Sequence, residues 1–132
     1  MKIKPYNKAE DEDKLMKLIE KEGKDWSCYS ADGVSEKYRA ALASSITYVA
    51  YEEDVLCGYS RSINDCDFYI YVCDLLVSPE HRGKNIGRKL IERIYKDYPN
   101  QIVYVMSDVD EYYKKQGYRR EGSIYEVKNN SK

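Results

Sequence analysis

The longest strand candidate in the sequence, DFYIYVCDLLV at residues 67–77, is the feature that most constrains the fold. Its apolar character is nearly continuous towards its end, which is typical of a strand covered on both faces. Further along the chain, the apolar residues Ile86, Leu90, Ile91 and Ile94 recur at helical spacing. This spacing predicts a helix over about 87–97, which Pro99 ends. QIVYVMS at 101–107 is predicted to be the next strand. A strand, a crossover helix and a second strand form a βαβ unit, which joins parallel strands.

Shorter patterns on either side of this unit predict a mixed α/β chain. The length of 132 residues indicates a single domain over 1–132. The predicted order of elements is β-α-α-β-β-β-α-β-α-β. Besides the βαβ unit, we expect strands at 2–6, 46–54, 55–62 and 123–127, and helices at about 8–22, 35–44 and within 109–118.

Composition excludes several classes of protein. Basic and acidic residues nearly cancel, at 22 against 23, which argues against a nucleic-acid partner. No apolar run approaches the length of a membrane span, and the N-terminal residues carry no secretion signal, so we expect a cytoplasmic protein without a membrane partner. With His81 as the single histidine and no CxxC pair, neither a metal site nor a redox dithiol is expected. Four free thiols in a reducing compartment are then expected at Cys28, Cys57, Cys66 and Cys73.

The turn between the long strand and its helix, SPEHRGKNIGRKL, is rich in glycine and positive charge. Open α/β sheets bind ligands at this place, and the start of a helix offers unpaired N–H groups that hold anions. Gly83 and Gly87 would let the backbone approach a ligand closely. The spacing GKNIGRK fits neither Walker A nor GxGxxG. The turn alone therefore predicts a phosphate-bearing ligand, with an ordinary turn bearing surface lysines as the alternative. Four basic side chains add positive charge: Arg82, Lys84, Arg88 and Lys89.

The segment VCDLLVSPEHRGKNIGRKLI resembles the acyl-CoA-binding motif of the GNAT N-acetyltransferase superfamily. The core of that motif is Gln/Arg-x-x-Gly-x-Gly/Ala, and Arg82 to Gly87 match it except at Asn85. A second segment, EYYKKQGY, resembles the Phe-Tyr-x-x-x-Gly-Phe segment of the family, at the matching distance. The resemblance covers essentially the whole chain. It implies the GNAT fold, a mixed and mostly antiparallel sheet with a central, splayed parallel strand pair.

By this resemblance the chain is expected to use acetyl-CoA as co-substrate and to transfer the acetyl group directly to a primary amine of an unidentified acceptor. The strands 67–77 and 101–107 would splay apart to form a slot for the thioester. The backbone would grip the pyrophosphate, and Asn85 would keep its N–H and tolerate the left-handed conformation, so binding should persist. The resemblance implies that the coenzyme-binding residues are Leu75, Leu76, Val77, Arg82, Gly83, Lys84, Asn85, Ile86, Gly87, Arg88 and Tyr113.

The resemblance places Tyr113 near the sulfur of the coenzyme, where its phenol would protonate the departing thiolate or orient the sulfur. The alternative is that Tyr113 only packs, as one of 15 tyrosines. The candidate base is Asp74, which would act directly or through water, or would hold a cationic acceptor. A purely structural Asp74 is the alternative. Asp108 and Asp110 are further candidates, although Asp108 would also suit the cap of a helix.

Two other functions remain open at this point. The first is a non-catalytic acyl-CoA-binding or sensing module of the same fold, which the departure at Asn85 favours. The second is an α/β domain that binds another phosphate ligand. The acceptor walls are expected to come from about 24–36 and 60–67, with Trp26 and Tyr29 either lining the mouth or capping the core. We expect a monomer or a homodimer.

Overall fold

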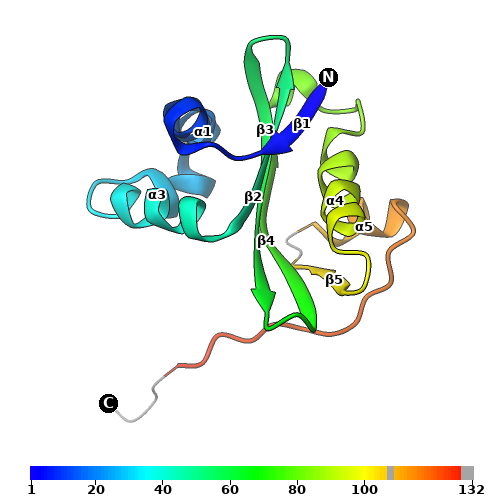
Figure 1. Ribbon diagram of the computed structural model, residues 1–132. Coiled ribbons are helices and arrows are strands. Elements are labelled where there is room, and N and C mark those ends of the chain that lie inside the picture. Colours follow the sequence, from blue (N-terminus) through cyan, green and yellow to red (C-terminus); the bar gives the residue numbers. More distant parts are fainter. Residues whose placement is uncertain (107–108, 129–132) are drawn as a thin grey trace.

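The computed structural model describes residues 1–106 and 109–128, in which a five-stranded sheet lies between helices (Figure 1). The strands follow one another across the sheet in chain order. Every neighbouring pair is antiparallel except β4 and β5, which are parallel. The expected mixed, mostly antiparallel sheet with one parallel pair is therefore confirmed. The strands are β1 (Lys2–Pro5), β2 (Ile46–Glu52), β3 (Val55–Asp65), β4 (Tyr69–Val77) and β5 (Ile102–Val105).

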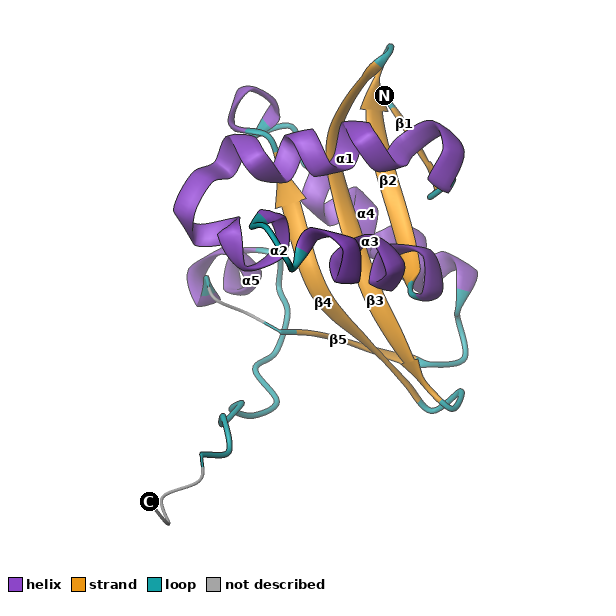
Figure 2. Ribbon diagram, turned by 90° about the vertical axis from the view of Figure 1, so that its left-hand side faces the viewer, coloured by secondary structure: helices purple, strands orange, loops and turns teal. Residues whose placement is uncertain are grey.

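Helices cover the two faces of the sheet, with α1 and α3 on one face and α4 on the other (Figures 1 and 2). The helices are α1 (Lys8–Glu22), α2 (Ser27–Ser30), α3 (Ser35–Ser44), α4 (Ile86–Asp97) and α5 (Asp110–Lys115), with 3₁₀ turns η1 (Gly23–Trp26) and η2 (Pro79–His81). Among these described helices, none is both long and apolar enough to cross a bilayer.

Each face of the sheet has its own apolar core. Leu15 and Leu42 are buried beneath α1 and α3, together with Tyr59 of β3. Leu90 and Ile94 of α4 are buried on the other face. The helical spacing of the apolar residues in α4 therefore marks a face that packs on the sheet, as the sequence predicts.

The predicted strand at 123–127 is wrong. Residues 118–128 form neither helix nor strand and extend away from the sheet (Figure 1). The side chains of Ile124, Tyr125 and Val127 are 72%, 85% and 96% exposed. Strand propensity reflects packing against a neighbouring strand. The described part of the chain provides no such neighbour for this segment, so its favourable composition does not produce a strand.

A fully buried carboxylate ties α1 to the sheet. Asp11 is 0% exposed and accepts hydrogen bonds from Lys4 Nζ at 2.7 Å, from the Asn7 N–H at 2.7 Å and from the Tyr51 hydroxyl at 2.5 Å. Burial acts to raise the pKa of Asp11, but the hydrogen bonds from Lys4, Tyr51 and Asn7 hold it below its ordinary value. One charged group thus joins β1, β2 and the start of α1.

Replacing this carboxylate should destabilise the fold in a pH-dependent way. Asp11→Asn should lower the free energy of unfolding at pH 7 by about 2 kcal/mol, because buried donors lose a charged acceptor. The folded-state pKa of Asp11 is depressed, so its contribution is present above the ordinary carboxyl pKa and is lost as the pH falls through the folded-state pKa. In urea denaturation, the difference from wild type should shrink between about pH 5 and pH 2. A difference that stays constant would show that ionisation of Asp11 contributes nothing.

Candidate functional site

The strands β4 and β5 pair over only the first half of β4. Their register runs from Tyr69 opposite Ile102 to Val72 opposite Val105. A hydrogen bond of 3.0 Å from the Met106 N–H to the Val72 carbonyl ends it. Beyond this point, residues 74–77 pair with β3 alone within the described part of the chain. The splayed parallel pair expected from the sequence is therefore present.

A β-bulge lies where the two strands separate. Asp74 is opposite Arg61, whereas Val72 is opposite the next residue, Ser62. Cys73 is therefore an extra residue on β4. An extra residue bends a strand and reverses which edge each later backbone group faces.

The bulge gives the end of β4 a defined set of backbone groups at its open edge. The Ser78 N–H donates to the Cys57 carbonyl on β3 at 2.8 Å. Because strand residues alternate, the backbone of Leu76 also faces β3, and the N–H and C=O groups of Leu75 and Val77 face the open edge. An extended ligand in the gap could thus pair with Leu75 and Val77 as an added strand would.

The turn from β4 to α4 needs two residues with positive φ. Gly83 has φ +85°, and Asn85, directly before α4, has φ 63° and ψ 24°. Asparagine adopts this left-handed region more readily than most residues, so Asn85 meets the backbone requirement of the glycine in the motif. Its side chain makes no capping hydrogen bond to α4. The Ser78 hydroxyl and His81 Nδ1, which lie 2.6 Å apart, hold the first part of the turn.

The start of α4 presents N–H groups without acceptors in their own helix. The Lys89 N–H donates to the Asn85 carbonyl at 3.0 Å, and the three preceding residues, Ile86, Gly87 and Arg88, have no carbonyl one turn before them in the helix. The positive end of the helix dipole lies here. The start of α4 follows directly after the open end of β4 and the turn. The coenzyme-binding residues predicted on β4 and those predicted in the turn are therefore neighbours.

The arginines of the turn bind other parts of the protein. Arg82 donates to the Val77 carbonyl at 3.0 Å and to Glu22 at 2.8 Å. Arg88 donates to Glu92 at 2.7 Å, one turn further along α4. These contacts use only some of the five donors of each guanidinium group, whereas the first backbone N–H groups of α4 have no acceptor within the helix.

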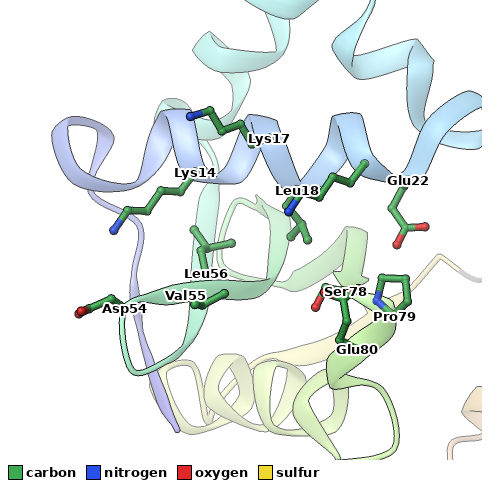
Figure 3. Close-up of a pocket in the computed structure, with 11 residues that line it drawn as sticks. Lys14, Lys17, Leu18, Glu22, Asp54, Val55, Leu56, Ser78, Pro79 and Glu80 are labelled. Atoms are coloured by element: carbon green, nitrogen blue, oxygen red, sulfur yellow. The ribbon is translucent and has the colours of Figure 1, made fainter.

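A separate pocket of about 290 Å³ lies between α1, the β2–β3 turn and the residues that follow β4 (Figure 3). Its charges nearly cancel, so it lacks the uniform positive potential that would attract a polyphosphate. The charged residues that line it are Lys14, Lys17, Lys21, Glu22, Asp54 and Glu80.

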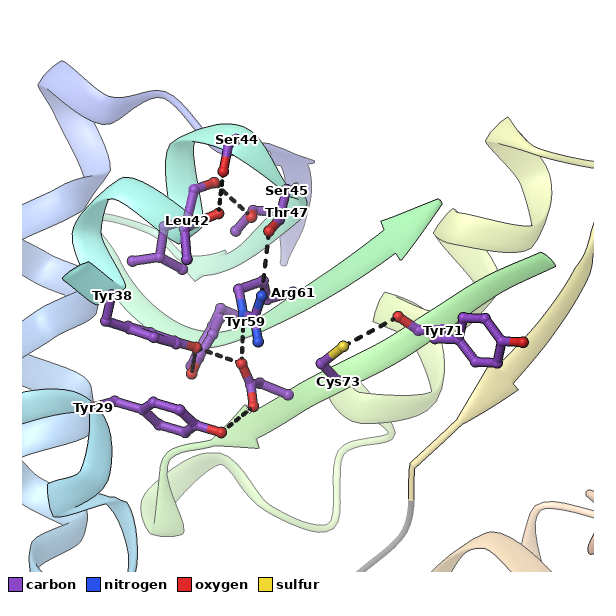
Figure 4. A network of polar contacts seen from close by, with 12 residues as sticks. Tyr29, Tyr38, Leu42, Ser44, Ser45, Thr47, Tyr59, Arg61, Tyr71 and Cys73 are labelled. Atoms are coloured by element: carbon purple, nitrogen blue, oxygen red, sulfur yellow. Dashed lines mark hydrogen bonds and ion pairs between the residues drawn. The ribbon is translucent and has the colours of Figure 1, made fainter. Parts of the chain in front are cut away.

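Asp74 is the centre of a buried polar network that includes Tyr29, Tyr38 and Arg61, whose side chains are labelled in Figure 4. It is 4% exposed and accepts hydrogen bonds from the Tyr29 hydroxyl at 2.8 Å, the Tyr38 hydroxyl at 2.6 Å and Arg61 Nε at 2.6 Å. The hydroxyls of Tyr38 and Tyr59 lie 2.7 Å apart. The network joins α2, α3, β3 and the bulged part of β4.

The groups of this network stabilise one another's protonation states. Burial and the neighbouring Asp74 raise the pKa values of Tyr29 and Tyr38, which keeps both phenols protonated as donors. Burial acts to lower the pKa of Arg61, but its hydrogen bond and ion pair with Asp74 raise it overall. Both oxygens of Asp74 already accept hydrogen bonds. These contacts fit the structural alternative for Asp74 better than its predicted use as a general base.

The sequence did not predict this network as a unit. The available signal was a charged residue in the middle of each of two neighbouring apolar strands, Arg61 and Asp74, which face each other in the register. Tyr29 and Trp26 pack against the core beneath α1, which agrees with the capping alternative. Of the other candidate carboxylates, Asp110 is exposed in α5, and Asp108 lies outside the described residues.

The tyrosines of α5 lie side by side. The rings of Tyr112 and Tyr113 are 5.1 Å apart at 83°, and the ring of Tyr113 stacks on Tyr118 at 6.2 Å and 19°. Both side chains of the pair are half-buried. Tyr112 reaches the start of α4, since a Cβ atom at Gly87 would lie 2.5 Å from its hydroxyl.

The buried ion pair should matter far more for stability than a surface pair of the same kind. Asp74→Asn should lower the free energy of unfolding by about 3 kcal/mol, because Arg61 is left buried without a counter-charge. Glu92→Gln, which removes the exposed partner of Arg88, is the control and should cost less than about 0.5 kcal/mol. Urea denaturation measures both. A loss below about 1 kcal/mol for Asp74→Asn would mean that solvent or another group compensates Arg61.

Comparison with solved structures supports the architecture over nearly the whole chain. An aminoglycoside acetyltransferase from an uncultured soil metagenomic sample has a TM-score of 0.75, with 98% of each chain covered and 20% identity. Aminoglycoside 6′-acetyltransferase type Ii has a TM-score of 0.76 at 22% identity, covering 92% of this chain and 85% of that one. A third, an aminoglycoside 6′-N-acetyltransferase complexed with coenzyme A, has a TM-score of 0.67 at 20% identity, covering 80% and 61%. At this level of identity the likeness concerns the fold.

Comparison of the sequence with known proteins identifies the family. Among curated proteins, GCN5-related N-acetyltransferase 2, chloroplastic, of Arabidopsis thaliana is 29% identical over 72 residues, and histone acetyltransferase TAP1 of Glycine max is 31% identical over 72 residues. Each match covers 51% of this chain but only 28% and 31% of these longer relatives. The family model of the acetyltransferase (GNAT) domain matches residues 43–120, more than half of the chain. The chain therefore belongs to the GNAT acetyltransferase family.

Proposed function

We propose that this chain is an acetyl-CoA-dependent N-acetyltransferase that transfers the acetyl group directly to a primary amine. One observation carries the proposal: the N–H groups at the start of α4 lie directly beyond the strand edge that the separation of β4 and β5 leaves open. Membership of the family supports acetyl transfer in general. A cytoplasmic location and a monomeric or homodimeric state stay predictions from the sequence.

In this proposal the coenzyme lies along the end of β4 and the start of α4. Backbone N–H groups between Arg82 and Arg88 bind the pyrophosphate, as anions bind at helix starts in general. Leu75 and Val77 pair with the pantetheine arm through their backbone, which requires Arg82 to release the Val77 carbonyl. A neighbouring structure bound to coenzyme A supports an acyl-CoA ligand for this fold.

The chemistry requires two proton transfers. A lysine-like amine, with a pKa of about 10.4, must lose a proton before it attacks the thioester carbonyl. The thiolate that leaves must gain one, and we assign this role to the Tyr113 hydroxyl. Since Asp74 is already bound by three donors, we assign it to holding the bulge of β4, and the amine then loses its proton to water.

A non-catalytic acyl-CoA-binding module is the second candidate function. It is favoured by Asn85, which departs from the motif, and by the engagement of Asp74 in structural contacts. The two candidates differ in one measurable property, the release of free coenzyme A when an acceptor is present.

The deciding experiment combines calorimetry with a thiol assay. Acetyl-CoA should bind to the purified protein, and one or more amines in a panel should cause release of free coenzyme A. The panel should contain aminoglycosides and lysine-containing histone peptides, because similar proteins include aminoglycoside acetyltransferases and a histone acetyltransferase. Polyamines and small amines complete the panel. Binding without thiol release for any amine would favour the module, and the absence of acetyl-CoA binding would refute both.

The proposed acid can be tested by removing one hydroxyl. Tyr113→Phe should lower kcat by roughly 10²–10⁴ with any amine that is turned over, while acetyl-CoA binding changes little. Tyr95→Phe is the control, because Tyr95 lies on the exposed side of α4 and is 58% exposed, and its kcat should equal that of wild type. If Tyr113→Phe matches wild type when chemistry is rate-limiting, Tyr113 has only a packing role.

The departure from the motif can be tested at Asn85. Asn85→Gly should keep or improve affinity for acetyl-CoA and change the free energy of unfolding by at most about 1 kcal/mol, because glycine adopts positive φ without strain but gains freedom when unfolded. Asn85→Ala, which keeps a Cβ atom in the left-handed region without the polar group, should lose about 1 kcal/mol. Calorimetry and thermal melts measure the two effects. A large loss of affinity in Asn85→Gly would reveal a contact between the Asn85 side chain and the coenzyme.

A further inference from the structure

Three tyrosine side chains form a cluster on β4 and β5. The ring centroids of Tyr69 and Tyr71 on β4 lie 6.2 Å apart, and that of Tyr104 on β5 lies 5.5 Å from Tyr69 and 5.7 Å from Tyr71. All three side chains are partly exposed, and their hydroxyls have no hydrogen-bond partner among the described residues. These three residues, which we call the aromatic cluster, thus offer ring surface and free hydroxyls to a ligand.

The aromatic cluster lies on the face of the sheet opposite α4. Ile70 and Val72, which alternate with the two tyrosines of β4, are buried in the core beneath α4. Val103 and Val105, which flank Tyr104 on β5, pack against the same core. Because successive side chains of a strand point to opposite faces, the tyrosines point to the face that α1 and α3 cover in part. The lower ends of β3, β4 and β5 extend beyond these helices (Figure 2), so α1 and α3 leave this part of the face uncovered.

The aromatic cluster lies next to the point where β4 and β5 separate. Tyr71 is opposite Tyr104 in the parallel register, and the next pair, Val72 with Val105, is the last. The proposed function places the coenzyme at the end of β4 and the start of α4, and α4 covers the other face of the sheet. An acceptor that reaches the thioester from the face opposite α4 therefore passes over the aromatic cluster.

The charges around the aromatic cluster favour a cation. Residues 62–72 and 101–106, which form this end of β3, β4 and β5, contain two aspartates and no lysine, arginine or histidine. Asp65 is opposite Tyr69 in the antiparallel register, so its exposed carboxylate lies on the same face, and it forms no ion pair with any described basic residue. The faces of aromatic rings attract cations, and a neighbouring carboxylate adds to that attraction.

We propose that the aromatic cluster and Asp65 bind a second positive charge of the acceptor. The substrate class is then an amine that carries another cationic group besides the amine that reacts, as polyamines and aminoglycosides do. The cluster extends from one to three residues before Val72, so the second charge lies about 3 to 10 Å from the point of separation. This cation takes no part in the transfer. The inference rests on the proposed function and names its substrate class.

Calorimetry with two matched ligands tests the charge directly. One ligand is an aminoalkane that ends in a trimethylammonium group, with a spacer that fits this distance, and the other ends in a tert-butyl group of the same shape. Both are titrated into protein saturated with coenzyme A, which carries no acetyl group to transfer. The charged ligand should bind about 3- to 30-fold more tightly, as expected for one contact of a cation with aromatic rings. Equal affinities, or tighter binding of the tert-butyl ligand, would overturn the inference, because hydrophobic burial alone favours the neutral group.

Variants locate the preference on the sheet. Tyr71→Leu keeps an apolar side chain but removes the ring, and should abolish most of the preference for the charged ligand, whereas Tyr71→Phe should retain it. Tyr95→Leu removes an exposed tyrosine from α4 on the other face and is the control, which should behave as wild type. A preference that is unchanged in Tyr71→Leu would overturn the assignment to the aromatic cluster.

A second pair of variants tests the carboxylate. Asp65→Asn should weaken binding of the charged ligand several-fold and leave the neutral ligand unaffected, because only the charged one gains from the carboxylate. Asp54→Asn, in the turn between β2 and β3 at the other end of the sheet, should change neither affinity. Equal effects of Asp65→Asn and Asp54→Asn would show that Asp65 is not part of the site and would overturn the inference as stated.

Turnover separates this inference from the proposed function. In the thiol assay, wild type should have a several-fold higher kcat/KM for diaminoalkanes than for monoamines of the same length, and Tyr71→Leu should reduce this ratio. Equal kcat/KM values for monoamines and diaminoalkanes in wild type would overturn the inference and leave the N-acetyltransferase in place. Failure of wild type to bind coenzyme A would overturn both.

Discussion

The pairing of β4 with β5 ends at one hydrogen bond, from the Met106 N–H to the Val72 carbonyl, and the rest of the site depends on that ending. A parallel pair that continued to Val77 would use the backbone groups of β4 for the sheet itself. Because β5 separates and Cys73 forms a bulge, Leu75 and Val77 instead present their backbone to an open edge. The same strand then leads into the turn whose next helix begins with unpaired N–H groups.

An interrupted strand needs support from its other face, and Asp74 provides it. Its contacts with Arg61, Tyr29 and Tyr38 join the bulge to β3 and to the short helices of the α1–α3 layer. Burying charges of this kind costs free energy unless every donor and acceptor has a partner. The network therefore favours one particular arrangement of these side chains, and its net contribution to stability is small. The surface pair of Arg88 with Glu92 is of a different kind, since solvent already satisfies both groups.

One side chain distinguishes this turn from the motif that it resembles. Asn85 meets the backbone requirement of the turn with its left-handed conformation, and its side chain makes no capping hydrogen bond to α4. The departure from the motif therefore leaves the backbone path into α4 intact. In the proposed function, the backbone N–H groups at the start of α4 then stay available to an anion.

The sequence by itself determined the βαβ unit, the apolar face of α4 and the glycine-containing turn, because periodicity and turn chemistry are local properties of a chain. Through the resemblance, the sequence also assigns coenzyme binding to residues of this turn, which stays a prediction. Only the tertiary structure decided that 123–127 forms no strand, since a strand depends on a partner and not on its own composition. The network around Asp74 and the approach of Tyr112 to Gly87 were decided in the same way. These contacts join residues far apart in the chain, and their partners follow from packing rather than from any local pattern.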